Sequence, residues 1–402
     1  MTRRADPPPG RQSPPSAHPA LRTVLCERFG IEVPVVQTGM GWVAGPRLTA
    51  ATSDAGGLGI LAAATMTTGQ LAAAIRDVKD RTDRPFGVNL RSEVADIDER
   101  VALLIRERVP VASFAQAPGE AVTKRLADAG VLVVPTVGAP RHAEKVAAWG
   151  VHAVIAQGAE GGGHTGAIPT SLLVPAVVDA VEVPVIAAGG FFDGRGLVAA
   201  LAWGAAGIAM GTRFLLTAES TVPEATKRRY LAAGLADTVV TRHIDGFPQR
   251  VIRTPLVEYL EGAGRLRALG RSLASAWRFR RLTGRRVADL VREARTLRRD
   301  RDLRWAQVVM AANAPMLTRA ALVDGHPDSG VLPTGQVVGM IGELPTVAQV
   351  IREVTETAVA TLERLAPGSG ARPAAWPAGT GLVVPESAGA GTGEDVTAHG
   401  GG

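Results

Sequence analysis

Residues 184–212, PVIAAGGFFDGRGLVAALAWGAAGIAMGT, contain two short apolar runs that each end in glycine. The runs PVIAAGG (184–190) and GIAMGT (207–212) are almost continuously apolar, as expected of parallel strands buried on both faces. The residues between the runs have apolar side chains at helical spacing. The stretch therefore predicts a strand, a helix and a second strand, each strand ending in a glycine turn.

The same pattern occurs earlier in the chain and predicts its fold. Eight strand–helix units within about 200 residues favour an α/β fold of the (β/α)₈ TIM-barrel type, with an open doubly wound sheet as the alternative. The six preceding runs are VPVVQT (33–38), LGILAA (58–63), PFGVNL (85–90), VPVASFA (109–115), VLVVPTV (131–137) and AVIAQG (153–158).

After Thr212 the alternation stops, which suggests a helical second domain inserted into the barrel. We expect five segments: a disordered, proline-rich N-terminal extension (1–22), a cofactor-binding barrel (23–221), a helical lid or substrate domain (222–325), a segment whose final helix closes the barrel (326–365), and a disordered tail (366–402).

Composition limits the class of protein. The chain of 402 residues is 46% hydrophobic and 20% charged, which is typical of a globular protein. Cys26 is the single cysteine, so neither an internal disulfide nor a CxxC metal site can form, as suits a cytoplasmic protein. The N-terminus lacks the apolar core of a signal peptide, and no apolar run is long enough to span a membrane. We expect no metal and no membrane partner.

Positive charge is concentrated in residues 265–304, where 14 arginines stand against four acidic residues. Such a segment is consistent with a solvated helical face, a nucleic-acid patch or a clamp for an anionic ligand. Trp277, Phe279 and Trp305 could stack on bases, but the chain has no recognised nucleic-acid-binding motif. We therefore expect no nucleic-acid partner.

Candidate phosphate-binding residues follow from the barrel. Active sites of (β/α)₈ enzymes lie at the C-terminal ends of the strands, and phosphate is often held after strands seven and eight. Glycine lets backbone N–H groups approach a phosphate closely. The alternative is that these residues are ordinary turn glycines. The candidates are Gly189 and Gly190 after the seventh strand, and Met210, Gly211 and Thr212 at the end of the eighth.

The sixth strand ends in AQGAEGGGHTG (156–166), which places His164 on a glycine-rich loop at the expected catalytic rim. A histidine can act as a general acid or base near neutral pH. A lone loop histidine is more often structural, so position alone leaves both interpretations open.

Six loops together identify a family. The segments VVQTGMGWVAG, DAGGLGILAAATMT, PFGVNL, VIAQGAEGGGHTG, PVIAAGGFFDGRGL and GAAGIAMGTRFLLT resemble the nitronate monooxygenase family, formerly called 2-nitropropane dioxygenases. The resemblance extends from about Cys26 to Leu365. It implies a (β/α)₈ barrel that contains FMN, has a helical second domain and acts on a small molecule.

The resemblance also implies roles for individual residues. His164 would be the catalytic base or proton donor, and Met40 would pack by the flavin ring. The other residues implied to contact the cofactor are Asn89 and Gln157 as hydrogen-bonding side chains, Gly162 as a close backbone approach, and Gly190, Gly211 and Thr212 as the phosphate site.

Finer features resemble a branch of the family associated with degradation of steroid C and D rings. They are QTGMGWVAG, EGGGHTG, GGFFDGRG, STVPEATKRRYLAAGL, WAQVVMAANAPML and LVDG. Ala209 and the Thr38–Gly39 pair depart from the pattern common in the wider family. The branch implies dehydrogenation of an indanone-carboxyl-CoA thioester, and arginines suit the phosphates of coenzyme A.

Two other enzyme functions remain open at this point. One is a nitronate monooxygenase that oxidises alkyl nitronates such as propionate 3-nitronate with O₂. The other is an FMN-dependent enoyl-acyl-carrier-protein reductase that uses NADH or NADPH, which the MGWV stretch resembles. The assembly we consider for this chain is a homodimer.

Overall fold

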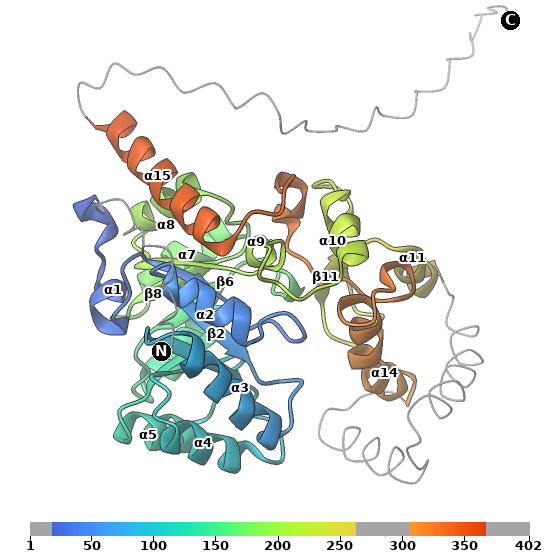
Figure 1. Ribbon diagram of the computed structural model, residues 1–402, viewed down its shortest axis with the longest axis horizontal. Coiled ribbons are helices and arrows are strands. Elements are labelled where there is room, and N and C mark those ends of the chain that lie inside the picture. The colour runs from blue at the N-terminus through green and yellow to red at the C-terminus, as the bar shows by residue number, and fades with distance from the viewer. Residues whose placement is uncertain (1–17, 263–304, 367–402) are drawn as a thin grey trace, which may run out of the picture.

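The computed structural model describes residues 18–262 and 305–366, and its centre is a closed barrel of eight parallel strands (Figure 1). The barrel closes because β1 pairs with both β2 and β9. This confirms the predicted α/β barrel. Its strands, in order around the barrel, are β1 (Val35–Gln37), β2 (Leu58–Ala62), β3 (Phe86–Leu90), β4 (Val111–Phe114), β5 (Leu132–Val137), β6 (Val154–Gln157), β8 (Val185–Ala188) and β9 (Gly207–Met210).

Alternate strand residues divide the apolar core into two layers. One set, including Val36, Ile60 and Ile186, packs inside the barrel with Leu25 and Phe29 of α1 (Val24–Phe29). The other set packs against the surrounding helices. Both faces of each strand are therefore buried, which explains the nearly continuous apolar runs in the sequence.

Seven helices follow the first seven barrel strands, and the eighth helix comes from the far end of the described chain. Directly after β9 the chain forms the short α9 (Thr212–Leu215), which does not fill the eighth helix position. That position, between α8 and α2, is occupied by α15 (Val347–Leu365). The other helices are α2 (Pro46–Asp54), α3 (Thr68–Arg81), α4 (Ile97–Arg106), α5 (Glu120–Asp128), α6 (Pro140–Ala147), α7 (Thr170–Val178) and α8 (Gly194–Ala202).

The described residues between α9 and α15 lie beside the barrel (Figure 1) and supply two strands of a sheet that the helical expectation did not include. The helices among the described residues of this segment are α10 (Glu224–Leu231), α11 (Pro255–Gly262) and α14 (Trp305–Leu322). Strands β10 (Thr238–Thr241) and β11 (Gln249–Ile252) pair antiparallel, and β11 also pairs with β7 (Gly163–His164). The β-branched residues in TVVT and QRVI favour strands over helices.

Several sequence expectations concern residues outside the described part of the chain. These are the basic segment, most of the N-terminal extension and the C-terminal tail. Within the extension, Pro19–Leu21 form a short 3₁₀ helix, and Leu21 is fully buried. Among the described helices, none has both the length and the apolar character needed to cross a membrane.

Close packing of α8 on α15 generates the first prediction. A Cβ atom at Gly194 would overlap the backbone nitrogen of Ala358 and the carbonyl oxygen of Val354, neither of which can move away by a side-chain rotation. Gly194→Ala should therefore lower the free energy of unfolding by about 1–3 kcal/mol, as overpacking does. The measurement is the midpoint of urea unfolding.

Gly69 in α3 provides the matched control, because a Cβ atom there meets no other atom. Gly69→Ala should leave the protein unchanged or stabilise it by about 0.4–1 kcal/mol through the unfolded state. Equal unfolding midpoints for Gly194→Ala and the wild type would refute the tight helix contact.

Candidate active site

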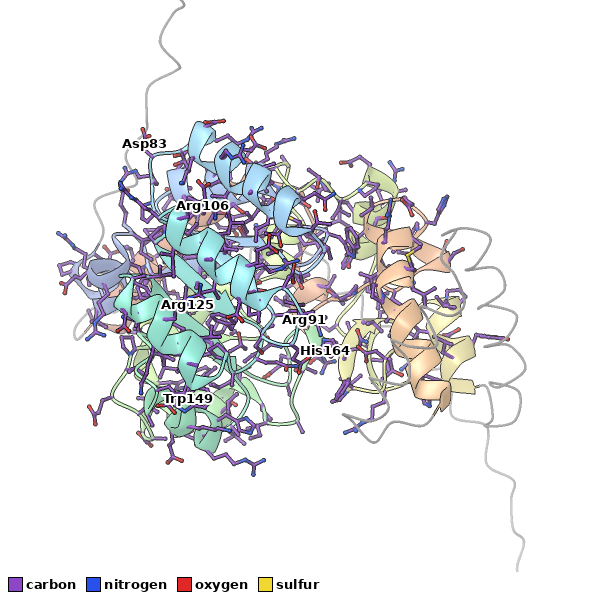
Figure 2. All side chains as sticks on the ribbon, turned by 90° about the horizontal axis from the view of Figure 1, so that it is seen from below. Asp83, Arg91, Arg106, Arg125, Trp149 and His164 are labelled. Carbon is purple, nitrogen blue, oxygen red and sulfur yellow. The ribbon has the colours of Figure 1, made fainter. Side chains whose placement is uncertain are left out.

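The loop after β6 holds His164 at the boundary between the barrel and the inserted segment (Figure 2). His164 belongs to β7, where it is paired in register with Gln249 of β11. The Gln157 side chain donates from Nε2 to the His164 carbonyl oxygen at 2.8 Å, and the Thr165 N–H donates to the Pro248 carbonyl at 3.1 Å. The backbone of His164 is thus fixed from both sides.

The imidazole of His164 is paired with a carboxylate that the sequence reasoning missed. Its Nε2 atom lies 2.7 Å from Oδ2 of Asp245, which is in the turn between β10 and β11. The His164 side chain is 63% exposed, whereas that of Asp245 is 14% exposed. A hairpin signal was present, because Asp245 and Gly246 lie between two β-branched runs, but no sequence signal links Asp245 to His164.

Asp245 is held in its ionised form. Burial raises the pKa of its carboxyl. The hydrogen bond and charge of His164, the N–H of Phe247 and the side chain of Gln249 lower that pKa, and together they outweigh the effect of burial. The net effect is a pKa below the ordinary value for aspartate. Near neutral pH the site therefore contains a buried negative charge beside an accessible imidazole.

The candidate phosphate loop after β8 has a backbone conformation that favours glycine. Gly189 and Gly190 have φ of +104° and +80°, in the left-handed region that favours glycine. They follow β8 and precede α8. Among the described residues, the backbone N–H groups of Gly162, Gly190 and Gly211 have no acceptor. Unpaired amides in adjacent loops are the donors that a phosphate group uses.

Packing brings the separate loops together. A side chain at Gly211 would meet the Thr38 hydroxyl and the Met40 sulfur, so Met40 lies against the loop after β9. The Thr212 hydroxyl accepts a hydrogen bond from the Gly335 N–H at 2.9 Å. Gly162 in turn packs directly on the backbone of Thr334 and Gly335. The β1, β6 and β9 loops therefore meet under the returning segment 330–342.

The remaining candidates lie at or next to the ends of barrel strands. Asn89 is 8% exposed, donates to the Ser113 hydroxyl at 3.2 Å and packs under Gly39. Met210 is buried, and its carbonyl accepts from the Thr38 N–H. All ten sequence-predicted site residues lie near the C-terminal ends of strands β1, β3, β6, β8 and β9 or in the loops that follow them. They are therefore at one end of the barrel.

These residues fit a flavin mononucleotide: three unpaired amides suit its phosphate, and Asn89, Gln157 and Met40 offer polar and apolar contacts to a ring. A separate cavity of about 330 Å³ lies at the start of α15 and contains none of the ten. In the described ranges no three His, Cys, Asp or Glu side chains form a group that could hold a metal ion.

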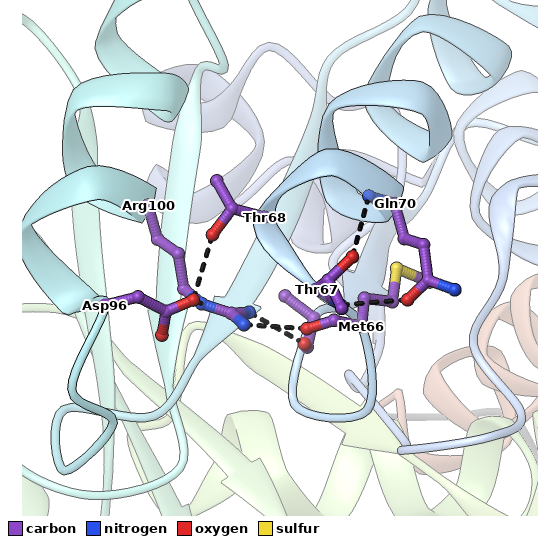
Figure 3. A network of polar contacts seen from close by, with 7 residues as sticks. Met66, Thr67, Thr68, Gln70, Asp96 and Arg100 are labelled. Carbon is purple, nitrogen blue, oxygen red and sulfur yellow. Dashed lines mark hydrogen bonds and ion pairs between the residues drawn. The ribbon is translucent and has the colours of Figure 1, made fainter.

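An ionic network fixes another loop at the same end of the barrel (Figure 3). Arg100 of α4 is 6% exposed and donates to the carbonyl oxygens of Ala63 and Met66, which follow β2. Asp96 pairs with the Arg100 guanidinium at 2.9 Å and accepts from the Thr68 hydroxyl at 2.9 Å. The network therefore holds the β2–α3 loop in one conformation.

Comparisons with known proteins give consistent results. The nitronate monooxygenase family model matches residues 22–100 and 91–357. A relative from Mycobacterium tuberculosis, named (3aS,4S,5R,7aS)-5-hydroxy-7a-methyl-1-oxo-octahydro-1H-indene-4-carboxyl-CoA dehydrogenase, is 58% identical over 346 residues, which are 85% of this chain and 98% of that protein. A protein of the same name from Rhodococcus jostii is 54% identical over 345 residues, 86% of this chain and 98% of its own. The solved structure of FabK from Thermotoga maritima has a TM-score of 0.71 and 34% identity over 86% of this chain and 98% of that one.

The Asp96 network generates a pH-dependent prediction. The hydrogen bond from Arg100 is the main cause that lowers the pKa of the Asp96 carboxyl below its ordinary value of 3.8. The hydrogen bond from the Thr68 hydroxyl lowers it by a smaller amount. The ion pair therefore stabilises the fold fully above that value and is lost as the pH falls through the lower, folded-state pKa. Asp96→Asn should reduce stability by about 0.5–1 kcal/mol at pH 7, allowing for screening of a partly exposed carboxylate.

Urea unfolding at pH 7 and at about pH 3 measures the difference in free energy of unfolding between the wild type and Asp96→Asn. This difference should be smaller at the lower pH. Asp98→Asn is the control on the same helix, because the Asp98 carboxylate is 86% exposed. A loss of unfolding free energy in Asp96→Asn that stays constant with pH, or equals the loss in Asp98→Asn, would contradict the role of the network.

Proposed function

The chain belongs to the nitronate monooxygenase family, and we propose that it is an FMN-dependent dehydrogenase that introduces a ring double bond into a steroid-derived indanone-carboxyl-CoA thioester. The observation that carries this proposal is the 54–58% identity, over 98% of their length, to two relatives named as dehydrogenases of an indene-carboxyl-CoA. The imidazole–carboxylate pair beside the glycine loops supports it from the structure.

The glycine loops are the proposed flavin site. The amides of Gly162, Gly190 and Gly211, with Gly189, Met210 and Thr212 in the same turns, would hold the phosphate. Met40, Asn89 and Gln157 would contact the ring system. When bound, FMN supplies the two-electron acceptor that an alkane-to-alkene oxidation requires.

His164 is the proposed catalytic base. A thioester makes the proton on its α-carbon acidic, and the exposed imidazole of His164 in β7 directly follows the glycines of the β6 loop. The imidazole takes that proton and becomes an imidazolium, whose charge the adjacent Asp245 carboxylate stabilises. Removal of the α-proton thus leaves its electron pair for the new double bond, and the β-hydrogen would leave as a hydride that a bound FMN would accept.

The inserted segment is the proposed substrate cover. We retain the division into a barrel (23–221), an insertion (222–325) and a closing segment (326–365). Phe247 in the insertion is 38% exposed, and its ring lies edge-on to His164 at 6.2 Å, so it offers an apolar surface to a hydrocarbon ring. We propose a small-molecule substrate, a cytoplasmic location and a homodimeric assembly.

Nitronate oxidation is the second candidate, and the family model itself favours it. A nitronate is small and singly charged, so the same imidazole and flavin loops would suffice for it. Reduction of an enoyl thioester by NADH or NADPH, the third function open from the sequence, would use the same cofactor site in the opposite direction.

Cofactor and substrate tests separate these functions. The purified protein should be yellow and contain about one FMN per chain. Under anaerobic conditions, an indanone-carboxyl-CoA ester should bleach the flavin absorbance, because substrate oxidation transfers two electrons to it. Bleaching by propionate 3-nitronate alone, or by NADH or NADPH alone, would favour the second or third function. A colourless protein that cannot be reconstituted with FMN would contradict all three.

The role of His164 has its own test. His164→Ala should retain bound flavin but reduce it with the CoA ester about 10²–10⁴-fold more slowly, which is the usual contribution of a general base. The measurement is anaerobic stopped-flow absorbance. His142, an exposed residue of α6, is the control, and His142→Ala should react at the wild-type rate. An unchanged rate in His164→Ala would exclude His164 as the base.

A further inference from the structure

We infer that Asp245 is the positioning residue of His164: it holds the imidazole with its proton on Nε2, so that Nδ1 is the nitrogen that receives the substrate proton. The placement of the ring proton rests on the contacts of the Asp245 carboxylate and on its being ionised. The assignment of Nδ1 to the reaction rests on the proposed function.

The geometry of the pair gives the ring two unequal ends. Nε2 is 2.7 Å from a carboxylate oxygen of Asp245, which is within the range of a charge-assisted hydrogen bond. The carboxylate is 14% exposed and the imidazole 63% exposed, so one end of the ring is enclosed and the other is accessible. In the described part of the chain, Nδ1 has no hydrogen-bond partner.

The remaining contacts of Asp245 determine which partner donates. Its Oδ1 atom accepts from the backbone N–H of Phe247 at 3.0 Å, and its Oδ2 atom faces the imidazole. An ionised carboxylate can only accept hydrogen bonds. Nε2 of His164 must therefore carry the proton that it shares with Oδ2, and in the neutral ring the lone pair is on Nδ1.

The surrounding strands limit rotation of the ring. Pairing of β7 with β11 fixes the His164 backbone opposite Gln249, only four positions after Asp245. The Phe247 ring meets the imidazole edge-on at an interplanar angle of 68°. The barrel supplies the imidazole and the insertion supplies the carboxylate and the aromatic ring, so the pair forms only where the two segments meet.

The substitution Asp245→Asn makes a directional prediction. The Phe247 N–H needs an acceptor, so the amide oxygen of asparagine should take the place of Oδ1 and leave the NH₂ group facing Nε2. That NH₂ group is a donor, so Nε2 must accept and the ring proton moves to Nδ1. The same change of tautomer inactivates serine proteases that carry asparagine in place of the triad aspartate.

The first measurement is the tautomer itself, by nitrogen-15 NMR of the histidine-labelled, flavin-loaded enzyme at about pH 9, which is well above the ordinary pKa of an imidazole. Comparison with His164→Gln identifies the His164 signals. We expect the Nε2–H tautomer in the wild type and the Nδ1–H tautomer in Asp245→Asn. A wild-type ring protonated on Nδ1, or the same tautomer in both proteins, would overturn the inference.

The second measurement is flavin reduction by the CoA ester in single turnovers. Asp245→Asn should slow reduction at least about 100-fold, with substrate affinity changed less than about twofold. Asp245→Glu, which keeps the acceptor, should recover most of the rate. Asp324→Asn, at an exposed ion pair with Arg319 in the insertion, should match the wild type. A weakened affinity at an unchanged rate, or equal losses in the Asn and Glu variants, would indicate a purely structural role and overturn the inference.

The two measurements test the proposed function and the position of the ring proton independently. If no CoA ester reduces the wild-type flavin, the proposed function fails, but the NMR comparison still decides where the ring proton lies. If Asp245→Asn does not fold, the wild-type tautomer and the rate of Asp245→Glu decide the outcome.

Discussion

The antiparallel pairing of β7 with β11 is the contact on which the geometry of the site depends. Residues Gly161–Gly163 are consecutive glycines, so the loop that carries His164 has little conformational preference of its own. The pairing of Gly163 and His164 with β11 supplies the missing order. Strand β11 is itself anchored, because Ile252 donates to the carbonyl of Leu332 in the segment that returns to the barrel. The position of one imidazole therefore depends on three segments far apart in the sequence.

Glycine has a second role here, which is to let neighbouring loops and strands pack closely. Gly39 lies on Asn89, and Gly162 lies on Thr334 and Gly335, at separations too small for any side chain. These contacts leave amide groups at fixed places in the loops instead of on flexible side chains. Preorganised backbone donors need no rearrangement when an anion binds, which is why such loops suit a phosphate-bearing cofactor.

The barrel could be predicted from the sequence because its signal is local. A strand buried on both faces is a short apolar run wherever it occurs, and each of the eight runs contains one barrel strand. Strands β10 and β11 were not predicted. They are four residues each, and β10 is partly exposed at a sheet edge, so pairing stabilises them more than their own composition does. The glycine loops were found through the barrel rule. Asp245 was not, since it lies 81 positions from His164 and contacts it only through the folded sheet.

The imidazole–carboxylate pair is divided between the barrel and the insertion, so the proposed base is oriented by the segment that is proposed to cover the substrate. A carboxylate as enclosed as that of Asp245 is costly to bury without a donor, so the hydrogen bond to His164 also favours the seating of the insertion on the barrel. Any movement that takes the β10–β11 turn away from the barrel must separate the pair. It must also remove the Phe247 ring from the imidazole, because Asp245 and Phe247 are joined by a hydrogen bond within the same turn. The exposed apolar surface of Phe247 and the orientation of the His164 imidazole are thus properties of one short turn, and a change in the shape of that turn alters both together.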